Sequence, residues 1–141
     1  RDRLMLLGLF DSRSVMNIHI EVGQRLPSFV GAMGRCVAAN STMKRYELET
    51  VFNELSWQRP PTFEAYLNDV EEARARGWAA DIDNFAEGVT TVAAAIADRD
   101  GAVQYCISNV LFSGQAETER LEEIGAAVTR AARDIQLQLY D

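Results

Sequence analysis

The chain has 141 residues, of which 48% are hydrophobic and 25% charged, a composition typical of one globular domain rather than of a disordered segment. Its 14 basic and 21 acidic residues give a formal net charge of −7. This balance disfavours a DNA-binding or membrane-binding surface, because neutralising phosphates requires clustered lysine and arginine.

The first third of the chain is predicted to hold a β-hairpin followed by a helix. Residues Leu4–Phe10 form a nearly continuous apolar run, which is typical of a buried strand. Residues Val15–Val22 alternate between apolar and polar, so we expect them to pair with the first run across the turn "DSRS". A loop over Gly23–Ser28 then leads into a helix expected at Val30–Ala39.

Two further helices are predicted in the middle of the chain. Apolar residues at helical spacing indicate a helix near Met43–Trp57, which the segment "RPPT" interrupts. Thr62 is placed to cap the N-terminus of a third helix, and Gly77 is placed to end it.

The second half of the chain is predicted to contain strands and then one long helix. Trp78–Asp81 is expected to be extended and "DIDNFAEG" to be a loop. Strands are expected at Gly88–Ala97 and Ala102–Phe112, joined by the turn "DRDG". A helix over Gln115–Leu139 closes the chain. Runs of strands and helices in this order predict an α+β fold, with an antiparallel sheet covered by helices.

Motifs of common catalytic, metal and membrane proteins are absent from the sequence. There is no G-x-S-x-G, H-E-x-x-H, P-loop or G-x-G-x-x-G motif. His19 is the only histidine, and we interpret it as structural rather than catalytic. Cys36 and Cys106 lie far apart, which favours free thiols in a reducing cytoplasm over a disulfide. No apolar run reaches the roughly 18 residues of a membrane span, and no secretory signal is visible. We therefore expect a cytoplasmic protein without metal or cofactor.

The stretch "FVGAMGRCVAAN" begins a helix with two glycines three residues apart. The first amide N–H groups of a helix have no partner within the helix. The small residues Gly31 and Ala32 leave these groups open to a carboxylate, which the helix dipole also favours. Close packing of the helix on the sheet explains the glycines equally well, so both interpretations stay open.

A second set of residues is predicted to form a hollow on one face of the sheet. By strand alternation, Thr91 shares a face with Ala93 and Ala95, and Ser108 shares one with Cys106 and Val110. With Asp81 at the end of an extended segment, this face suits a small organic ligand. Ordinary strand polarity is the alternative explanation for Thr91 and Ser108.

The segments "LPSFVGAMGRCVAA" and "ARARGWAADIDNFAEGVTTVAAAIADRDGAVQYCISNV", with the long helix that follows, resemble the effector-binding domain of the IclR family of bacterial transcription regulators. The resemblance rests on the ordered set G-A-x-G-R/K, R-G-W-A-x-D, G-V-x-x-x-A-A, D-x-x-G and I-S. It implies a GAF-like or profilin-like curved antiparallel sheet flanked by helices, with residues 1–141 as a single effector-binding domain. It also implies a winged helix-turn-helix DNA-binding domain and a connecting helix upstream of Arg1.

The resemblance also implies a binding site for a small carboxylic acid. Gly31 and Ala32 match the family's backbone anchor, Asp81 its aspartate and Ser108 its first serine. Five positions depart from the family pattern: Thr91 stands in place of a cysteine, Val110 of a second serine, Phe29 of a histidine, Ala95 of a proline and Asn84 of a glutamate.

These departures predict an effector that is larger or more apolar than glyoxylate or pyruvate, and an aromatic acid is one candidate. The candidate apolar walls of the pocket are Phe29, Met33, Phe85, Cys106 and Val110.

The favoured function is ligand sensing by a homo-oligomeric transcription regulator, dimer or tetramer, that contacts DNA only through its upstream domain and contacts no membrane. Effector binding is expected to change DNA binding of the full-length protein, as repressor or as activator. One alternative is a small lyase or hydrolase with Asp81 or His19 as base, although no nucleophile–base pair supports it. Another is a structural oligomerisation module that uses the long helix.

Overall fold

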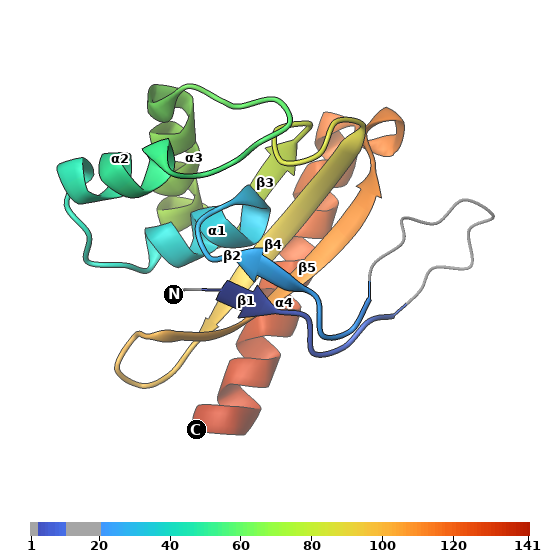
Figure 1. Ribbon diagram of the computed structural model, residues 1–141. Coiled ribbons are helices and arrows are strands. Elements are labelled where there is room, and N and C mark those ends of the chain that lie inside the picture. The colour runs from blue at the N-terminus through green and yellow to red at the C-terminus, as the bar shows by residue number, and fades with distance from the viewer. Residues whose placement is uncertain (1–2, 11–20) are drawn as a thin grey trace.

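The computed structural model describes residues 3–10 and 21–141 (Figure 1). The elements in chain order are β1 (Arg3–Met5), β2 (Arg25–Pro27), α1 (Gly31–Ala39), α2 (Arg45–Asn53), α3 (Phe63–Arg76), β3 (Ala79–Ile82), β4 (Val89–Ala97), β5 (Val103–Phe112), the 3-10 helix η1 (Ser113–Gln115) and α4 (Thr118–Tyr140). The predicted α+β class and the long C-terminal helix are confirmed. No helix within the described ranges is long and apolar enough to cross a membrane.

The central sheet consists of three antiparallel strands in the order β3-β4-β5. The turn between β4 and β5 is closed by Asp98, whose Oδ1 accepts hydrogen bonds from the main-chain N–H groups of Asp100 and Ala102. Strand β3 pairs with only part of β4, from Ala79 opposite Ala93 to Ile82 opposite Thr90. The last residues of β4 therefore extend beyond the start of β3.

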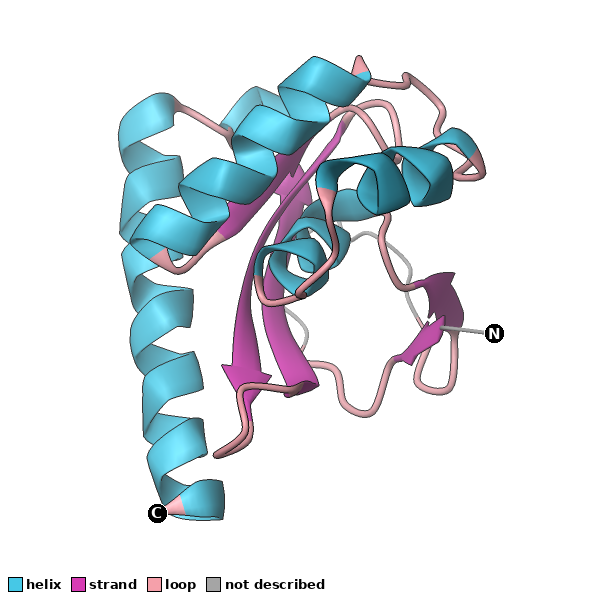
Figure 2. Cartoon of the chain, turned by 90° about the vertical axis from the view of Figure 1, so that its left-hand side faces the viewer, coloured by secondary structure: helices cyan, strands magenta, loops and turns pink. Residues whose placement is uncertain are grey.

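Helices cover both faces of this sheet (Figure 2). Along β4, alternate residues Val92, Ala94 and Ile96 pack against α4 on one face. Ala93 and Ala95 lie on the opposite face, in the cluster formed with α1 and α3. Full burial of a valine or isoleucine side chain stabilises a fold by roughly 1.5–3 kcal/mol, so the alternation within β4 fixes which helices lie on which face.

The two glycines at the start of α1 have different structural roles. Gly31 has a φ of +74°, a left-handed conformation that favours glycine. Gly34 allows a close approach, because a Cβ at this position would lie 2.1 Å from the main-chain carbon of Phe29. The main-chain oxygen of Phe29 in turn accepts a 2.8 Å hydrogen bond from the Tyr66 hydroxyl on α3. The entry to α1 is thus held tightly against α3.

A third glycine lets α4 pack against an indole ring. A Cβ at Gly125 would lie 2.2 Å from Cε2 of Trp78, the residue that precedes β3. The guanidinium carbon of Arg76 lies 3.4 Å from the centroid of the Trp78 ring. A glycine inside a helix lowers stability by roughly 1 kcal/mol relative to alanine. At Gly125 the missing side chain allows the Trp78 ring to pack directly against α4.

Helix α3 has the two caps that the sequence predicts. The Thr62 hydroxyl accepts a 3.1 Å hydrogen bond from the N–H of Ala65. Gly77 ends the helix with a φ of +91°, and its N–H bonds to the oxygen of Ala73. A threonine N-cap typically stabilises a helix by about 1 kcal/mol.

The N-terminal prediction was wrong in its described parts. The first strand ends at Met5 instead of Phe10, and Arg25–Pro27 is a strand instead of part of a loop. Leu4 pairs with Leu26 in this two-stranded sheet, and just beyond it the N–H of Leu6 bonds to the oxygen of Gln24 and the N–H of Gly23 bonds to the oxygen of Leu6. The predicted partner strand at Val15–Val22 lies mostly outside the described residues, as does His19, and its last residue, Val22, is in a turn.

The second predicted helix is shorter than expected, since α2 covers Arg45–Asn53 instead of Met43–Trp57. The residues after it form main-chain hydrogen bonds to a distant loop. The N–H of Gln58 bonds to the oxygen of Phe85, and the N–H of Arg59 bonds to the oxygen of Asn84. These bonds need an extended backbone, so the helix ends before them. The last helix also begins later than predicted, at Thr118, after the short η1 turn.

We predict that Gly34→Ala and Gly125→Ala each lower the free energy of unfolding by about 2–3 kcal/mol, because the added methyl group meets main chain or a packed ring. Gly114→Ala is the matched control, since a Cβ there would contact nothing within 4 Å. It is expected to change stability by less than about 0.5 kcal/mol. Urea denaturation measures all three, and unchanged midpoints for Gly34→Ala and Gly125→Ala would contradict the described packing.

Candidate functional site

A fully buried arginine occupies the centre of the candidate site. Arg35, on α1, is 0% exposed. Its Nη1 donates to Asp81 Oδ2 at 2.7 Å and to the main-chain oxygen of Gly31 at 3.1 Å. Its Nε donates to Asp69 Oδ2 at 2.9 Å, and its Nη2 donates to Asn84 Oδ1 at 3.0 Å. One side chain thus connects α1 with α3, β3 and the loop that follows β3.

Aromatic rings line the guanidinium of Arg35. Its central carbon lies 5.4 Å from the ring centroid of Trp57 and 5.5 Å from that of Tyr66. Cation–π contacts of this kind favour a desolvated cation by about 2 kcal/mol. The Nε1 of Trp57 is the buried side-chain nitrogen that has no hydrogen-bond partner in the described part of the chain. Sequence reasoning missed both Arg35 and Trp57, although an arginine four residues after Gly31 in an otherwise apolar helix was a usable signal.

Asp81 lies beside the start of α1, where the sequence predicts it, but its carboxylate is already engaged. Oδ2 accepts the bond from Arg35. Oδ1 accepts hydrogen bonds from the N–H groups of Asn84 and Phe85, each at 3.1 Å. The residue is 2% exposed. Asp81 therefore shapes the loop after β3 and pairs with Arg35, which leaves it little capacity for a ligand.

Asp69 is the outer partner of Arg35, and its side chain is 40% exposed. Partial burial raises the pKa of the Asp69 carboxyl above its ordinary value, and the Arg35 guanidinium partly offsets that rise. The ion pair with the buried Asp81 is the more protected of the two, because solvent screens an exposed pair.

The N-terminus of α1 presents main-chain donors. Val30 occupies the N-cap position with no side-chain hydrogen bond to the helix, and the N–H of Gly34 bonds to the Val30 oxygen. The N–H groups of Gly31 and Ala32 have no hydrogen-bond partner among residues 3–10 and 21–141. A Cβ built on Gly31 would contact nothing within 4 Å. Close packing thus explains Gly34, whereas binding of a carboxylate at the Gly31 and Ala32 amides stays a prediction.

The predicted sheet residues share the face that α1 covers. Asp81 lies opposite Thr91, and Thr91 lies opposite Val110, so the three form one row across the sheet. Ser108 lies in the next row, opposite Ala93. The main-chain oxygen of Ala93 accepts a 3.2 Å hydrogen bond from the Cys36 thiol on α1. Thr91, Ser108 and Val110 are half-buried, so this face remains partly open.

The candidate apolar walls lie around this face. Phe29 and Met33 pack against the cluster under α1. Phe85 lies in the loop after β3, where its N–H bonds to Asp81. Cys106 lies opposite Ala95, and neither it nor Cys36 forms a disulfide. Burial raises the pKa of the Cys106 thiol to about 11 and that of Cys36 to about 12, so both are protonated at neutral pH.

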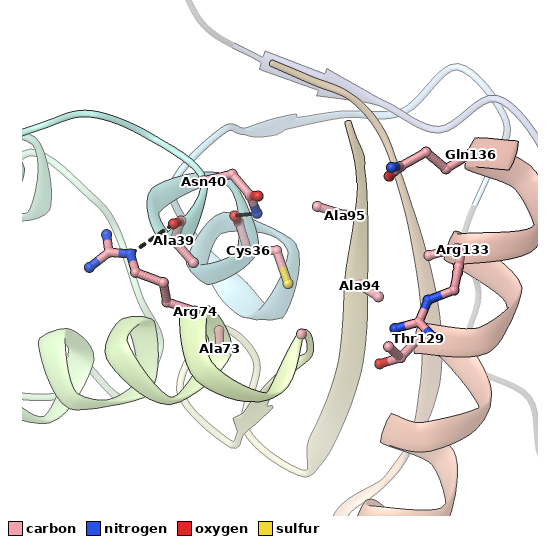
Figure 3. A pocket seen from close by; sticks show the side chains of 12 residues that line it. Cys36, Ala39, Asn40, Ala73, Arg74, Ala94, Ala95, Thr129, Arg133 and Gln136 are labelled. Carbon is pink, nitrogen blue, oxygen red and sulfur yellow. Dashed lines mark hydrogen bonds between the residues drawn. The ribbon is translucent and has the colours of Figure 1, made fainter. Parts of the chain in front are cut away.

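Two grooves open at the edges of the sheet, and the predicted effector-site residues line neither. The first, of about 240 Å³, lies between α1, α3 and α4 beside the end of β4 (Figure 3). The second, of about 360 Å³, lies beside β3, between α3 and the start of α4. No group of three or more His, Cys, Asp or Glu side chains within the described residues is arranged to hold a metal ion.

Comparison with known proteins identifies relatives of the whole chain. The family model "Bacterial transcriptional regulator IclR C-terminal" matches residues 2–137. The chain is 26% identical over 138 residues to the HTH-type transcriptional repressor AllR of Escherichia coli K12, covering 96% of this chain and 51% of AllR. It is 25% identical over 143 residues to the HTH-type transcriptional regulator KdgR of the same strain, covering 98% of this chain and 54% of KdgR.

The fold is also shared with a solved structure. The IclR transcriptional regulator from Alicyclobacillus acidocaldarius matches with a TM-score of 0.81 and 22% identity, covering 96% of this chain and 56% of that chain. The chain spans about half the length of the curated relatives that it matches. It therefore belongs to the IclR family of bacterial transcriptional regulators and corresponds to their C-terminal domain.

Proposed function

We propose that this chain is the effector-sensing part of a transcription regulator and that it binds a small organic acid at the N-terminus of α1. The observation that carries the proposal is that the N–H groups of Gly31 and Ala32 have no hydrogen-bond partner in the described part of the chain. Gly31 itself has a left-handed conformation, and a Cβ there would meet open space. Helix N-termini attract carboxylates through these N–H groups and through the helix dipole.

The opposite wall of the proposed site is the sheet face that carries Thr91 and Ser108. Both hydroxyls lie on the side of the sheet that α1 covers, in adjacent rows. Neither hydroxyl forms a hydrogen bond within the described ranges. They are therefore free to bind a carboxylate or another polar group of the effector, while Phe29, Met33 and Val110 bind its apolar part.

The ion pair of Arg35 with Asp81 allows a negatively charged ligand to bind close to the Asp81 carboxylate. Two unit charges 4 Å apart interact by about 4 kcal/mol at an effective dielectric constant of 20, so an unpaired Asp81 would repel a bound carboxylate. The 2.7 Å contact with Arg35 neutralises it. We assign Asp81 the role of a positioning residue rather than of a direct ligand.

The effector is proposed to be more apolar than glyoxylate or pyruvate, with aromatic acids as candidates. Relative to the family pattern, Val110 and Phe29 place apolar side chains where a serine and a histidine are common. Both are half-buried; Val110 lies opposite Thr91 on the sheet, and Phe29 lies two residues before Gly31.

Effector binding is proposed to change the arrangement of the loop after β3. Asn84 receives a bond from Arg35, and its own amide donates to the main-chain oxygen of Arg59. A ligand at Gly31 therefore acts on α1, Arg35 and this loop as one connected unit. Allosteric coupling typically amounts to 1–3 kcal/mol, enough to alter how an oligomer positions DNA-binding domains upstream of this chain.

A titration monitored by NMR of backbone amides tests the proposal. Benzoate is expected to shift the Gly31 and Ala32 amides and to bind more tightly than glyoxylate. Thr91→Val and Ser108→Ala are each expected to weaken benzoate binding about three- to tenfold, the value of one hydrogen bond. Thr50→Val, an exposed threonine on α2, is the matched control. Tighter binding of glyoxylate, or no shift at Gly31 and Ala32, contradicts the proposal.

A second prediction separates Asp81 from Asp69. Asp81→Asn is expected to lower the free energy of unfolding by about 2–4 kcal/mol, because it leaves the Arg35 cation buried with a weaker partner. Asp69→Asn is expected to cost less than about 1 kcal/mol, since its carboxylate is partly exposed. Thermal or urea denaturation measures both changes. Equal effects of the two substitutions would show that the buried pair has no special role.

A further inference from the structure

The end of β4 presents main-chain groups that no strand in the described ranges covers. The N–H of Asp83 bonds to the oxygen of Val89, which marks that pair as hydrogen-bonded in the β3–β4 ladder. Hydrogen-bonded pairs alternate along an antiparallel ladder. Odd-numbered residues of β4 therefore point their N–H and C=O groups toward β3.

The register confirms this direction for Ala95. On the other side of β4, the N–H of Ser113 bonds to the oxygen of Gly88, so even-numbered residues point toward β5. Because β3 begins at Ala79, opposite Ala93, it does not reach Ala95. The N–H and C=O of Ala95 thus point to the free edge and have no hydrogen-bond partner in the described part of the chain.

Ala95 lines the groove of about 240 Å³ beside the end of β4. The walls of this groove come from the C-terminal ends of α1 and α3 on one side and from α4 on the other (Figure 3). Small side chains create the space: Ala39, Ala73, Gly77, Ala94, Ala95 and Ala132. The volume is on the order of eight water molecules at their liquid volume, so it suits a small molecule.

The groove has a positive lining in a protein whose net charge is −7. Arg74 and Arg133 line it, and no aspartate or glutamate of the described residues does. Arg74 directs its guanidinium away, to the Ala39 oxygen and to Glu71. Arg133, on α4, has no ion-pair or hydrogen-bond partner within residues 3–10 and 21–141. Its guanidinium is free to bind an anion.

We propose that this groove is a second ligand site, which binds a small carboxylate that also carries an amide group. The amide N–H of the ligand donates to the C=O of Ala95, and one carboxylate oxygen accepts from the N–H of Ala95, as the N–H and C=O of a neighbouring strand residue would. The carboxylate also pairs with Arg133. A simple anion is not sufficient, because it has no N–H group to donate to the C=O of Ala95.

This site is separate from the one at the N-terminus of α1. Asn40, at the C-terminal end of α1, lines the groove, while Gly31 is at the other end of the helix. Nine helical residues span about 13 Å. A ligand in the groove contacts the α1–α3 layer and α4 together, so it bridges the two faces of the sheet.

Backbone-amide NMR of the 141-residue chain tests the proposal with three probes: N-acetylglycine, acetate and the neutral N-acetylglycinamide. N-acetylglycine is expected to shift the amides of Ala95, Thr129 and Gln136, and to bind at least fivefold more tightly than either other probe. Arg133→Gln is expected to weaken it five- to tenfold, because a charge-assisted hydrogen bond is lost. Arg130→Gln, an exposed arginine one turn earlier on α4 and outside the groove, is the matched control and is expected to leave binding unchanged.

Four results would each overturn the proposal. One is the absence of shifts at Ala95 and Thr129 with N-acetylglycine, and another is an equal effect of Arg133→Gln and Arg130→Gln. The third is equal binding of acetate and N-acetylglycine, which would remove the role of Ala95. Shifts confined to Gly31 and Ala32 would place the probe at the first site and so also reject the second.

Discussion

The structure depends on one buried cation. Arg35 has no solvent exposure and donates to Asp81, Asp69, Asn84 and the main-chain oxygen of Gly31. Removing a charge of this kind from water costs several kcal/mol, so the fold retains it only because carboxylates and aromatic faces surround it. In satisfying Arg35, the chain brings together α1, α3, β3 and the loop after β3. The start of α1, with its open amides, is held at the sheet by the same contacts.

This arrangement gives the proposed sensor a physical basis. Rigid packing at Gly34 and the Arg35 contacts fix the donors at Gly31 and Ala32, and fixed donors bind a ligand without first losing conformational freedom. The loop after β3 is tied both to Arg35 and to residues 58–59. A ligand that moves the start of α1 therefore has a direct mechanical connection to the outer loops. The groove at the end of β4 lies at the opposite end of α1 and offers a second point at which a ligand can act on the same helix.

Much of the fold follows from the sequence, because the signals are local. Thr62 and Gly77 mark the ends of α3, and the turn "DRDG" marks the β4–β5 hairpin. Alternation along β4 correctly separates Val92 from Ala93. The predicted helix boundaries are wrong where contacts with distant residues determine the backbone conformation. The chain after Asn53 leaves the helix, and its main chain then bonds to the loop at Asn84 and Phe85. The site shows the same division. Asp81 and Thr91 lie in one row of the sheet face that α1 covers, whereas the pairing of Asp81 with Arg35, far apart in sequence, was not visible from spacing.

A double-mutant cycle between Arg35 and Asp81 tests the importance of the buried ion pair most directly. Arg35→Met and Asp81→Leu are each expected to lower the free energy of unfolding by about 3–5 kcal/mol, since each removes one partner of the buried ion pair and leaves the other charge buried without it. The loss of unfolding free energy in the double variant is expected to be at least about 2 kcal/mol smaller than the sum of the two single losses, because neither charge of the pair remains. Additive losses in the double variant would show that the two side chains act independently and would contradict the central role of this ion pair in the fold.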